Sequence, residues 1–160
     1  SVPCKDDIEL GPLSEEVLTD LAPLAEHKGI ALNCSGGALV IGSDTLLYRL
    51  VFNLVENAIR YSRPGSTVNV FICDNDSHVL LRVEDQGPGI PKQYRESIFQ
   101  PFFRVDKSRS RAYGGAGLGL ALVWEIATLH GGTAEVESSS ENGTVMLVAL
   151  PKRTTAQSDC

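Results

Sequence analysis

The chain has 160 residues, of which 42% are hydrophobic and 21% charged, and its net charge is −6. A chain of this length can form one domain with a complete hydrophobic core. The acidic balance argues against a nucleic-acid partner, because no broad basic surface is available, and no apolar run reaches the roughly 18 residues of a membrane-spanning helix.

The first segment, residues 1–13, is mixed and polar, which predicts a linker or an edge strand and does not fit a signal peptide. A helix is expected over residues 14–27, with Ser14 as its N-cap and Gly29 as its end. The four cysteines are scattered without metal-ligand spacing, which favours a reducing compartment over a disulfide framework. We expect two of them, Cys34 and Cys73, to be small buried residues.

The middle of the chain predicts strands and a second helix. Residues 29–34 and 37–42 have strand composition. The run DTLLYRLVFNLVENAIRYS then predicts an amphipathic helix, which begins near Ser43 or Asp44 and ends before Pro64.

The remaining elements follow in quick succession. Strands are expected over 66–74 and 78–85, a short helix over 91–99, an exposed mobile loop over 104–116, a helix over 117–130, and closing strands over 133–139 and 144–151. Short connections between successive strands favour an α+β fold. The sequence thus predicts a two-layer α/β sandwich, with a mixed, mostly antiparallel sheet and helices on one face. The domain is expected to span residues 14–151, followed by a tail over 152–160.

The second helix carries an unusual polar surface. At about 100° per residue, its polar residues fall within one arc, here called the polar arc: Arg49, Asn53, Glu56, Asn57 and Arg60. The opposite arc is apolar and is expected to face the core: Leu47, Val51, Leu54, Val55 and Ala58.

The polar arc has two interpretations. On composition alone it is an ordinary solvated face. Such a face usually pairs lysines with glutamates, whereas Asn53 and Asn57 present two neutral oxygens side by side. Hard oxygen ligands of this kind suit a Mg2+ ion that also binds phosphate oxygens, and the carboxylate of Glu56 could accept a proton.

Two glycine-rich segments add to this pattern. In VEDQGPGIP, a strand ends at Asp85 and is followed by Gly87 and Gly89, which is either a simple turn or a close approach of the backbone to a ligand. In GGAGLGLALVWEIATLHGG, glycines open a helix, as in a flexible hinge or a phosphate site. The second segment is neither a P-loop nor a dinucleotide fingerprint.

The order of these segments closely resembles the ATP-binding catalytic domain of sensor histidine kinases, within the wider group of Hsp90, gyrase and mismatch-repair ATPases (the Bergerat fold). NLVENAIRYS resembles the family's asparagine box, DQGPGI its first glycine box, IFQPFFRVDKSR its phenylalanine box and GGAGLGL its second glycine box. The resemblance runs from about residue 44 to residue 151, roughly two-thirds of the chain.

The resemblance implies roles for the polar arc. Asn53 and Asn57 would hold Mg2+ and the oxygens of ATP. Glu56 would accept the proton during phosphoryl transfer, and Arg60 would contact phosphate.

The remaining site residues implied by the resemblance bind the rest of the nucleotide. Asp85 would accept a hydrogen bond from the adenine amino group. The other implied contacts are to the base or the phosphates: Tyr61, Gly87, Gly89, Ile90, Gly115, Gly117, Leu118, Gly119 and Thr144.

The implied reaction transfers the γ-phosphoryl group of ATP to a histidine on a helical dimerisation domain. None of His27, His78 and His130 lies in the setting of that acceptor, so we expect all three to be structural and the acceptor domain to be missing from this chain. The resemblance further implies a response regulator downstream, a homodimeric parent protein, and a cytoplasmic location beneath a probable inner-membrane anchor in bacteria. The chain itself is expected to be soluble and monomeric.

Two alternatives remain. One is another enzyme of the same fold, such as a serine-kinase anti-sigma factor or a mismatch-repair ATPase; the segment FFRVDKSR close before the second glycine box argues against it. The other is a nucleotide-binding module without kinase activity, against which the intact Asn53, Glu56, Asn57 and Asp85 argue.

Overall fold

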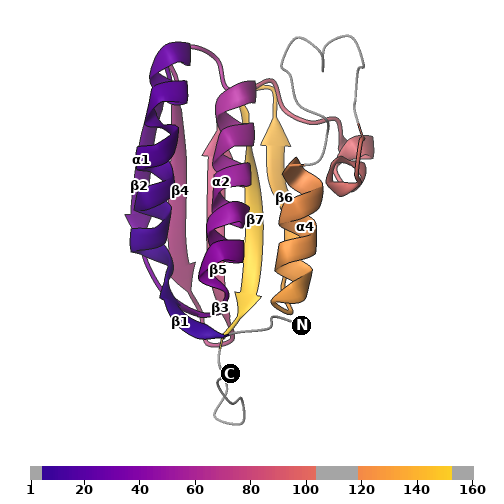
Figure 1. The fold of residues 1–160 in the computed structure, drawn as a ribbon. Helices are drawn as coiled ribbons and strands as arrows, with labels where there is room; N and C mark the ends of the chain where they lie inside the picture. Colours follow the sequence, from indigo (N-terminus) through magenta and orange to yellow (C-terminus); the bar gives the residue numbers. More distant parts are fainter. Residues whose placement is uncertain (1–4, 104–118, 153–160) are drawn as a thin grey trace.

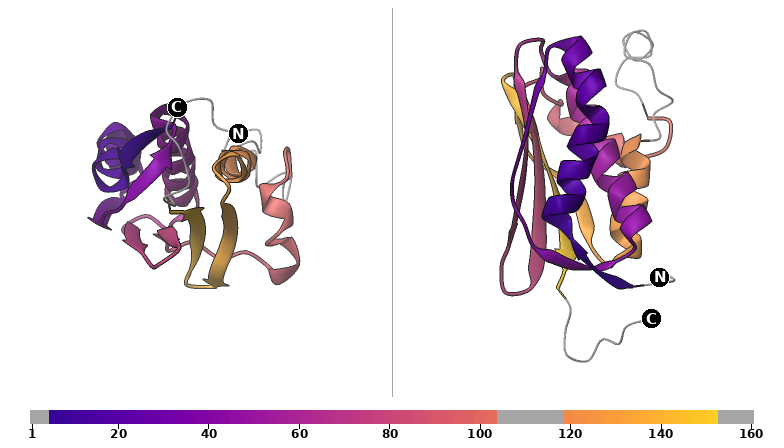
Figure 2. Two further views of the ribbon diagram at one scale, coloured as in Figure 1. Left: turned by 90° about the horizontal axis from the view of Figure 1, so that it is seen from below. Right: turned by 60° about the vertical axis from the view of Figure 1, so that its left-hand side comes forward.

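The computed structural model describes residues 5–103 and 119–152. Three helices cover one face of a five-stranded sheet, as Figures 1 and 2 show. The helices are α1 (Leu10–Lys28), α2 (Asp44–Tyr61) and α4 (Gly119–Leu129). The sheet contains β2 (Ala31–Gly36), β4 (Thr67–Asp74), β5 (His78–Asp85), β6 (Thr133–Ser140) and β7 (Gly143–Pro151). The two-layer α+β architecture predicted from the sequence is confirmed.

The sheet has the strand order β2-β4-β5-β7-β6. Only its β2–β4 pair is parallel, and the other three pairs are antiparallel. The short connection between β2 and the next strand, β3 (Leu39–Gly42), does not form a hairpin, because these two strands do not pair. Instead β3 pairs with β1 (Asp6–Glu9) in a separate two-stranded sheet.

Helix α2 has the expected cap and the expected core face. The Ser43 side chain accepts a hydrogen bond from the Leu46 N–H at 3.3 Å, which satisfies one of the free donors at the helix start. The apolar arc is fully inside the core, since each of its members is at most 2% exposed: Leu47, Val51, Leu54, Val55 and Ala58. The 3.6-residue period of the sequence therefore predicted correctly which face of α2 lies in the core.

Helix α1 begins earlier than the sequence predicted. Its first residue is Leu10, whose N–H bonds the Ala38 carbonyl at 3.0 Å, so Ser14 lies inside the helix and does not cap it. The reason is an apolar stripe, including the buried Leu10 and Leu13, that extends one turn before the polar residues at 14–16. The helix ends as expected at Gly29, which has a left-handed conformation with φ of 78°.

Two other local predictions were wrong. Residues 91–99 form two short 3₁₀ helices, Lys92–Tyr94 and Ser97–Phe99, and not one α-helix. Cys73 is exposed and Cys34 is only half-buried, although both were expected to be buried. Cys73 lies near the end of β4, where its side chain alternates away from the buried Ile72.

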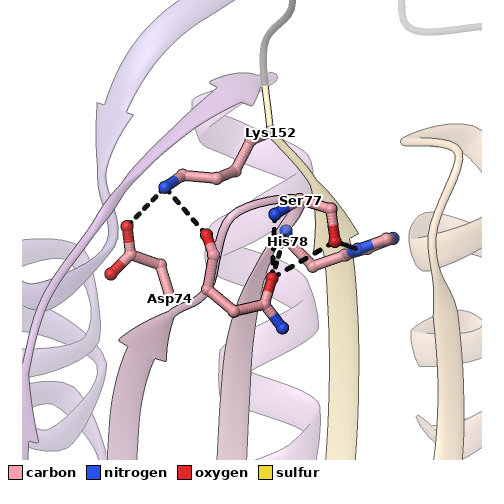
Figure 3. A network of polar contacts seen from close by, with 5 residues as sticks. Asp74, Ser77, His78 and Lys152 are labelled. Carbon is pink, nitrogen blue, oxygen red and sulfur yellow. Dashed lines mark hydrogen bonds and ion pairs between the residues drawn. The ribbon is translucent and has the colours of Figure 1, made fainter.

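A polar network closes the β4–β5 turn at the end of the sheet where β7 finishes (Figure 3). The Asn75 side-chain oxygen accepts hydrogen bonds from the N–H groups of Ser77 and His78, which makes an Asx-type turn. Lys152 pairs with Asp74 at 2.7 Å and also bonds the Asn75 carbonyl at 3.0 Å. These contacts fasten the last described residue of the chain to the turn.

His130 has a structural setting at the end of α4. Its Nε2 accepts a hydrogen bond from the Ser43 N–H at 3.2 Å, and its Nδ1 lies 2.8 Å from the Ile126 carbonyl oxygen. Burial lowers the pKa of His130 from its usual value, which keeps the ring neutral in this position. The ring thus joins the end of α4 to the start of α2.

Among the described residues, no helix combines the length and the apolar character needed to cross a membrane.

Candidate functional site

The polar arc of α2 is partly covered, unlike a fully solvated helix face. Asn53, Glu56, Asn57 and Arg60 are all of intermediate burial. Glu56 and Arg60 form an i,i+4 ion pair at 3.8 Å, and about a third of each side chain is exposed (31% and 33%). A pair so exposed contributes little to stability, so folding alone does not explain this surface.

Asn53 shows the clearest sign of an incomplete environment. Its side-chain nitrogen is buried and has no hydrogen-bond partner among the described residues. The start of α4 lies over it, since a Cβ placed on Gly119 would lie 3.9 Å from the Asn53 side-chain oxygen. A buried polar group without a partner is costly unless a ligand supplies one. The start of α4, at the end of the segment GGAGLGL, therefore lies against Asn53.

Asp85 ends β5 and is the one buried carboxylate among the described residues, with 6% of its surface exposed. Its Oδ1 accepts hydrogen bonds from the N–H groups of Gly87, at 2.9 Å, and Thr144, at 3.2 Å. Among the described residues, no hydrogen bond or ion pair reaches Oδ2. Burial raises the pKa of Asp85, while the two N–H donors partly oppose that rise. One carboxylate oxygen is thus fixed by the protein, and the other remains for a ligand.

Two glycines let the backbone pass closely around this carboxylate. A Cβ on Gly87 would collide with the carbonyl oxygen of Tyr61 at the end of α2. Gly89 has φ of 87°, and a Cβ there would collide with the Ser140 carbonyl oxygen at the β6–β7 turn. Side chains at either position would push the segment away from its neighbours. The glycines therefore bring the end of α2, the end of β5 and the β6–β7 turn together.

A chain of hydrogen bonds orders Ile90 and Thr144 beside Asp85. The Ile90 N–H donates to the Ser139 hydroxyl at 2.8 Å, and that hydroxyl lies 2.7 Å from the hydroxyl of Thr144. Arg95 stabilises the same region, because its guanidinium donates hydrogen bonds to the carbonyl oxygens of Ile90 and Ser139. Sequence reasoning selected Ile90 and Thr144 but missed Ser139 and Arg95.

A second brace joins the first glycine box to the end of α2. The Gln86 N–H donates to the Ser62 hydroxyl at 3.2 Å, and the Gln86 side-chain oxygen accepts from the Thr67 N–H at 2.8 Å. Arg63 donates to the carbonyl oxygens of Gln86, at 3.1 Å, and Glu141, at 2.8 Å. No sequence signal distinguishes Ser62, Arg63 and Gln86, because their hydrogen-bond partners lie far away along the chain.

The described site residues form two adjoining groups. The polar arc and Gly119 make one group, and the surroundings of Asp85 make the other: Tyr61, Gly87, Gly89, Ile90 and Thr144. Tyr61 joins them, because it follows Arg60 at the end of α2 and its carbonyl oxygen lies against Gly87. Figure 1 shows the end of α2, the end of β5 and the start of α4 in the upper half of the same view. Gly115, Gly117, Leu118 and the predicted loop over 104–116 lie outside the described residues.

A cation at this site would need ligands beyond the protein's acids and histidines. Within residues 5–103 and 119–152, no three His, Cys, Asp or Glu side chains form a cluster that could hold a metal. The site instead offers amide oxygens from the polar arc and one nearby carboxylate, Glu56. Such a set fits an ion that takes part of its coordination from phosphate oxygens and water.

Comparison with known proteins places the chain in a family. Residues 42–154 match the family described as histidine kinase-, DNA gyrase B- and HSP90-like ATPases. The sensor histidine kinase RppB of Synechocystis is 38% identical over 149 residues, which cover 92% of this chain and 32% of RppB. The chain thus spans about a third of this relative's length.

Solved structures agree with that match. The mycobacterial sensor histidine kinase MprB superposes with a TM-score of 0.79 at 30% identity, covering 94% of this chain and 99% of the MprB chain. Full-length ShkA in complex with AMPPNP superposes with a TM-score of 0.83 at 25% identity, covering 98% of this chain and 33% of ShkA.

The chain therefore belongs to the family of histidine kinase-, DNA gyrase B- and HSP90-like ATPases. Within that family, it is an ATP-binding catalytic domain of the sensor histidine kinase type.

Proposed function

We propose that this domain binds ATP with Mg2+ and transfers the γ-phosphoryl group to a histidine on a dimerisation domain outside this chain. The observation that supports this most directly is the pair of incomplete polar groups at one end of the molecule. Asn53 has a buried nitrogen without a partner, and Asp85 has a buried carboxylate with one oxygen unbonded among the described residues. A nucleotide carries partners for both, since phosphate oxygens can accept from the Asn53 nitrogen and the adenine amine can donate to Asp85.

The Asp85 group is proposed to hold the adenine base. The unbonded Oδ2 of Asp85 accepts a hydrogen bond from the exocyclic amine, while the N–H groups of Gly87 and Thr144 keep the carboxylate in place. Ile90 and Tyr61 line the base, and the half-exposed Tyr61 ring (40% exposed) has room to contact it. A carboxylate acceptor selects adenine over guanine, which has a carbonyl at the corresponding position.

The polar arc is proposed to hold the phosphates. The oxygens of Asn53 and Asn57 are the Mg2+ ligands, and Arg60 with the backbone around Gly119 contacts phosphate oxygens. A Mg2+ ion held by these residues would supply charge neutralisation for the transferring group, and the protein itself would contribute mainly position and electrostatics. Glu56, paired with Arg60 at 3.8 Å, is placed to accept the remaining proton of the acceptor imidazole.

An apolar groove beside this site fits the acceptor domain. It has a volume of about 340 Å³ and lies on α4, with lining residues that include Phe99, Pro101, Trp124 and Leu129. Trp124 is 49% exposed and packs against Phe99, with ring centroids 6.1 Å apart. Since α4 starts over Asn53, a helical domain seated in this groove would present its histidine near the phosphates.

The wider assembly follows from the same proposal. The acceptor domain belongs to the parent protein, which is a homodimer in the cytoplasm, connected to a sensor and an inner-membrane anchor. A response regulator receives the phosphoryl group, and no nucleic acid is involved.

Two measurements test the proposal together. Calorimetry with a non-hydrolysable ATP analogue should show binding that weakens when Mg2+ is removed. Labelled ATP should phosphorylate an added dimerisation domain from a sensor kinase, with an acid-labile product, and should leave this chain itself unlabelled. Strong acid-labile labelling of this chain alone would show that His27, His78 or His130 is an acceptor. Binding without any transfer would favour a nucleotide-binding module without kinase activity.

A further inference from the structure

A large groove lies on the flank of the molecule away from α4. It has a volume of about 780 Å³ and runs between one side of α1 and the edge strand β2. Figure 1 shows α1 and β2 on one flank, with α4 and β6 on the other. No residue of the candidate nucleotide site lines it. Twelve residues do so: Glu15, Leu18, Thr19, Ala22, Ala25, Glu26, Gly29, Ile30, Ala31, Leu32, Asn33 and Cys34.

Strand β2 offers unpaired backbone groups to this groove. It is the last strand on its side of the sheet, and its one neighbour is β4. The Ala31 N–H bonds the Ser66 carbonyl at 3.0 Å, so Ala31 turns its backbone groups toward β4. In a parallel ladder the next residue turns them the other way. Among the described residues, no hydrogen bond reaches the outward backbone groups of Leu32 and Cys34.

The edge also lacks the features that usually protect a free strand. Its six residues, ALNCSG, include no lysine, no proline and no charge. Natural proteins commonly shield such an edge with charged residues, prolines or a covering segment. An unshielded edge beside a groove is the arrangement in which an extended peptide adds to a sheet.

The side chains of the groove indicate what such a peptide would contain. Its charged lining residues, Glu15 and Glu26, are both acidic. Leu18 and Ile30 are nearly buried beneath it, and the half-buried Leu32 adds apolar surface. Burial, and then the nearby Glu15, raise the pKa of Cys34 to about 11, which is consistent with a negative potential in the groove.

We propose that β2 and the adjoining side of α1 form a docking groove for an extended segment of a partner protein, whose every second residue faces α1 and is either basic or apolar. The segment adds to the sheet as a further strand beside β2. Its backbone bonds the outward groups of Leu32 and Cys34, its basic side chains reach Glu15 and Glu26, and its apolar side chains contact the α1 flank. This surface is separate from the nucleotide site and from the α4 groove.

The proposal can be tested with the whole 160-residue chain and a capped lysine–valine peptide, in which lysine and valine take turns at every second position and serine fills the positions between them. Cys34 serves as the reporter in a variant whose other cysteines, Cys4, Cys73 and Cys160, are replaced by serine. The rate of thiol modification is measured at alkaline pH, because the Cys34 thiol ionises late. We expect saturating peptide to slow the modification at least about tenfold and to slow amide exchange at Leu32. A glutamate–valine peptide should do neither.

Matched variants separate the groove from the general charge of the domain. Glu15→Lys with Glu26→Lys reverses the two groove carboxylates, whereas Glu16→Lys with Asp76→Lys makes the same change in net charge at exposed positions outside the groove lining. We expect the first pair to weaken peptide binding at least tenfold and the second to weaken it less than threefold. Equal weakening by both pairs would overturn the proposal.

Other outcomes would also overturn it. If both peptides protect Cys34 equally, the groove does not select basic segments. If Cys34 becomes protected as the chain alone is concentrated, and sedimentation shows a dimer, the occupant is a second copy of this chain. If Leu32 exchanges at the same rate with and without bound lysine–valine peptide, the peptide does not pair with β2.

Discussion

Two aspartates end neighbouring strands of the same sheet and have opposite environments. Asp74 ends β4 and is exposed, with 46% of its side chain accessible and a lysine partner, Lys152, at 2.7 Å. Asp85 ends β5 and is 6% exposed, and among the described residues no cation pairs with it. Because β4 and β5 are antiparallel, the two lie at opposite ends of the sheet.

In the proposed function, the difference separates a structural carboxylate from one that binds the adenine base. An exposed ion pair is cheap to form and contributes little. A buried carboxylate without a cation is costly, and the raised pKa of Asp85 reflects that cost. Such a residue persists where function requires it, whereas Asp74 and its neighbours only close a turn. Four predictions test this contrast.

The largest effect is expected on the polar arc. Glu56→Gln keeps the shape of the side chain but removes its charge and its capacity to accept a proton. ATP binding should remain nearly normal, while phosphoryl transfer to an added dimerisation domain should slow about 10²–10⁴-fold, the usual range for a positioned general base. The low end is expected, because a neutral imidazole requires less activation than a hydroxyl. Asn57→Ala should instead lose Mg2+-dependent binding.

Thermal unfolding without ligand is the control for both variants. Glu56 and Asn57 lie outside the buried core, so neither change should alter stability much. Transfer at the parent rate by Glu56→Gln, or unfolding of both variants, would show that the polar arc is structural.

The next effect concerns the base pocket. Asp85→Asn can keep an oxygen for the N–H groups of Gly87 and Thr144, but it then presents an NH₂ donor where the adenine amine also donates. A mispaired buried contact costs on the order of 1–3 kcal/mol, or roughly tenfold to a hundredfold in affinity. Calorimetry with ATP and GTP measures both the loss and the selectivity. Equal affinity of the parent domain for ATP and GTP would contradict the proposed role of Asp85.

Asp85→Asn should weaken ATP binding, but it should increase the stability of the free domain. The folded-state pKa of Asp85 lies above its unfolded value, so stability decreases as pH rises through the window between the two and stays lower above it. Asp85→Asn removes this cost, so the variant should be more stable than the parent near neutral pH. The advantage should disappear in acid, where Asp85 is protonated. Urea unfolding at several pH values, without nucleotide, measures this; a variant less stable at neutral pH would mean that the two N–H donors outweigh burial.

The helix and strand periodicities predicted most of the fold. The apolar arc of α2 and the strands up to Asp85 were predicted correctly, because hydrophobic spacing is a local property that the chain shows directly. Ser14 was wrongly predicted to be the N-cap of the first helix. The apolar residues before it, Leu10 and Leu13, already belong to that helix. Residues 91–99 have a helical start signal but fold into two 3₁₀ helices.

Candidate site residues that belong to a sequence motif could be predicted. Residues that are recruited by hydrogen bonds to distant backbone groups could not. Asn53, Asp85 and Thr144 follow from the order of the boxes. Ser139 and Arg63 could not be found, because they bond carbonyl and N–H groups more than twenty residues away along the chain. Only the assembled sheet brings such groups within hydrogen-bond distance.

The smallest effect is expected at the opposite end of the sheet. Lys152→Ala removes the ion pair with Asp74 and the hydrogen bond to the Asn75 carbonyl. Both partners are more than a third exposed, so the loss of stability should be at most about 1 kcal/mol, which shifts the melting temperature by about 2–4 °C in a domain of this size. The difference should shrink in high salt, because solvent ions screen an exposed pair.

ATP affinity should not change, since the network touches no residue of the candidate site. Asp74→Asn is the matched variant, because it removes the charge from the other side of the pair. A change of more than about threefold in ATP affinity in either variant would show that the two ends of the sheet are coupled and that the contrast between Asp74 and Asp85 is not one of structure against function.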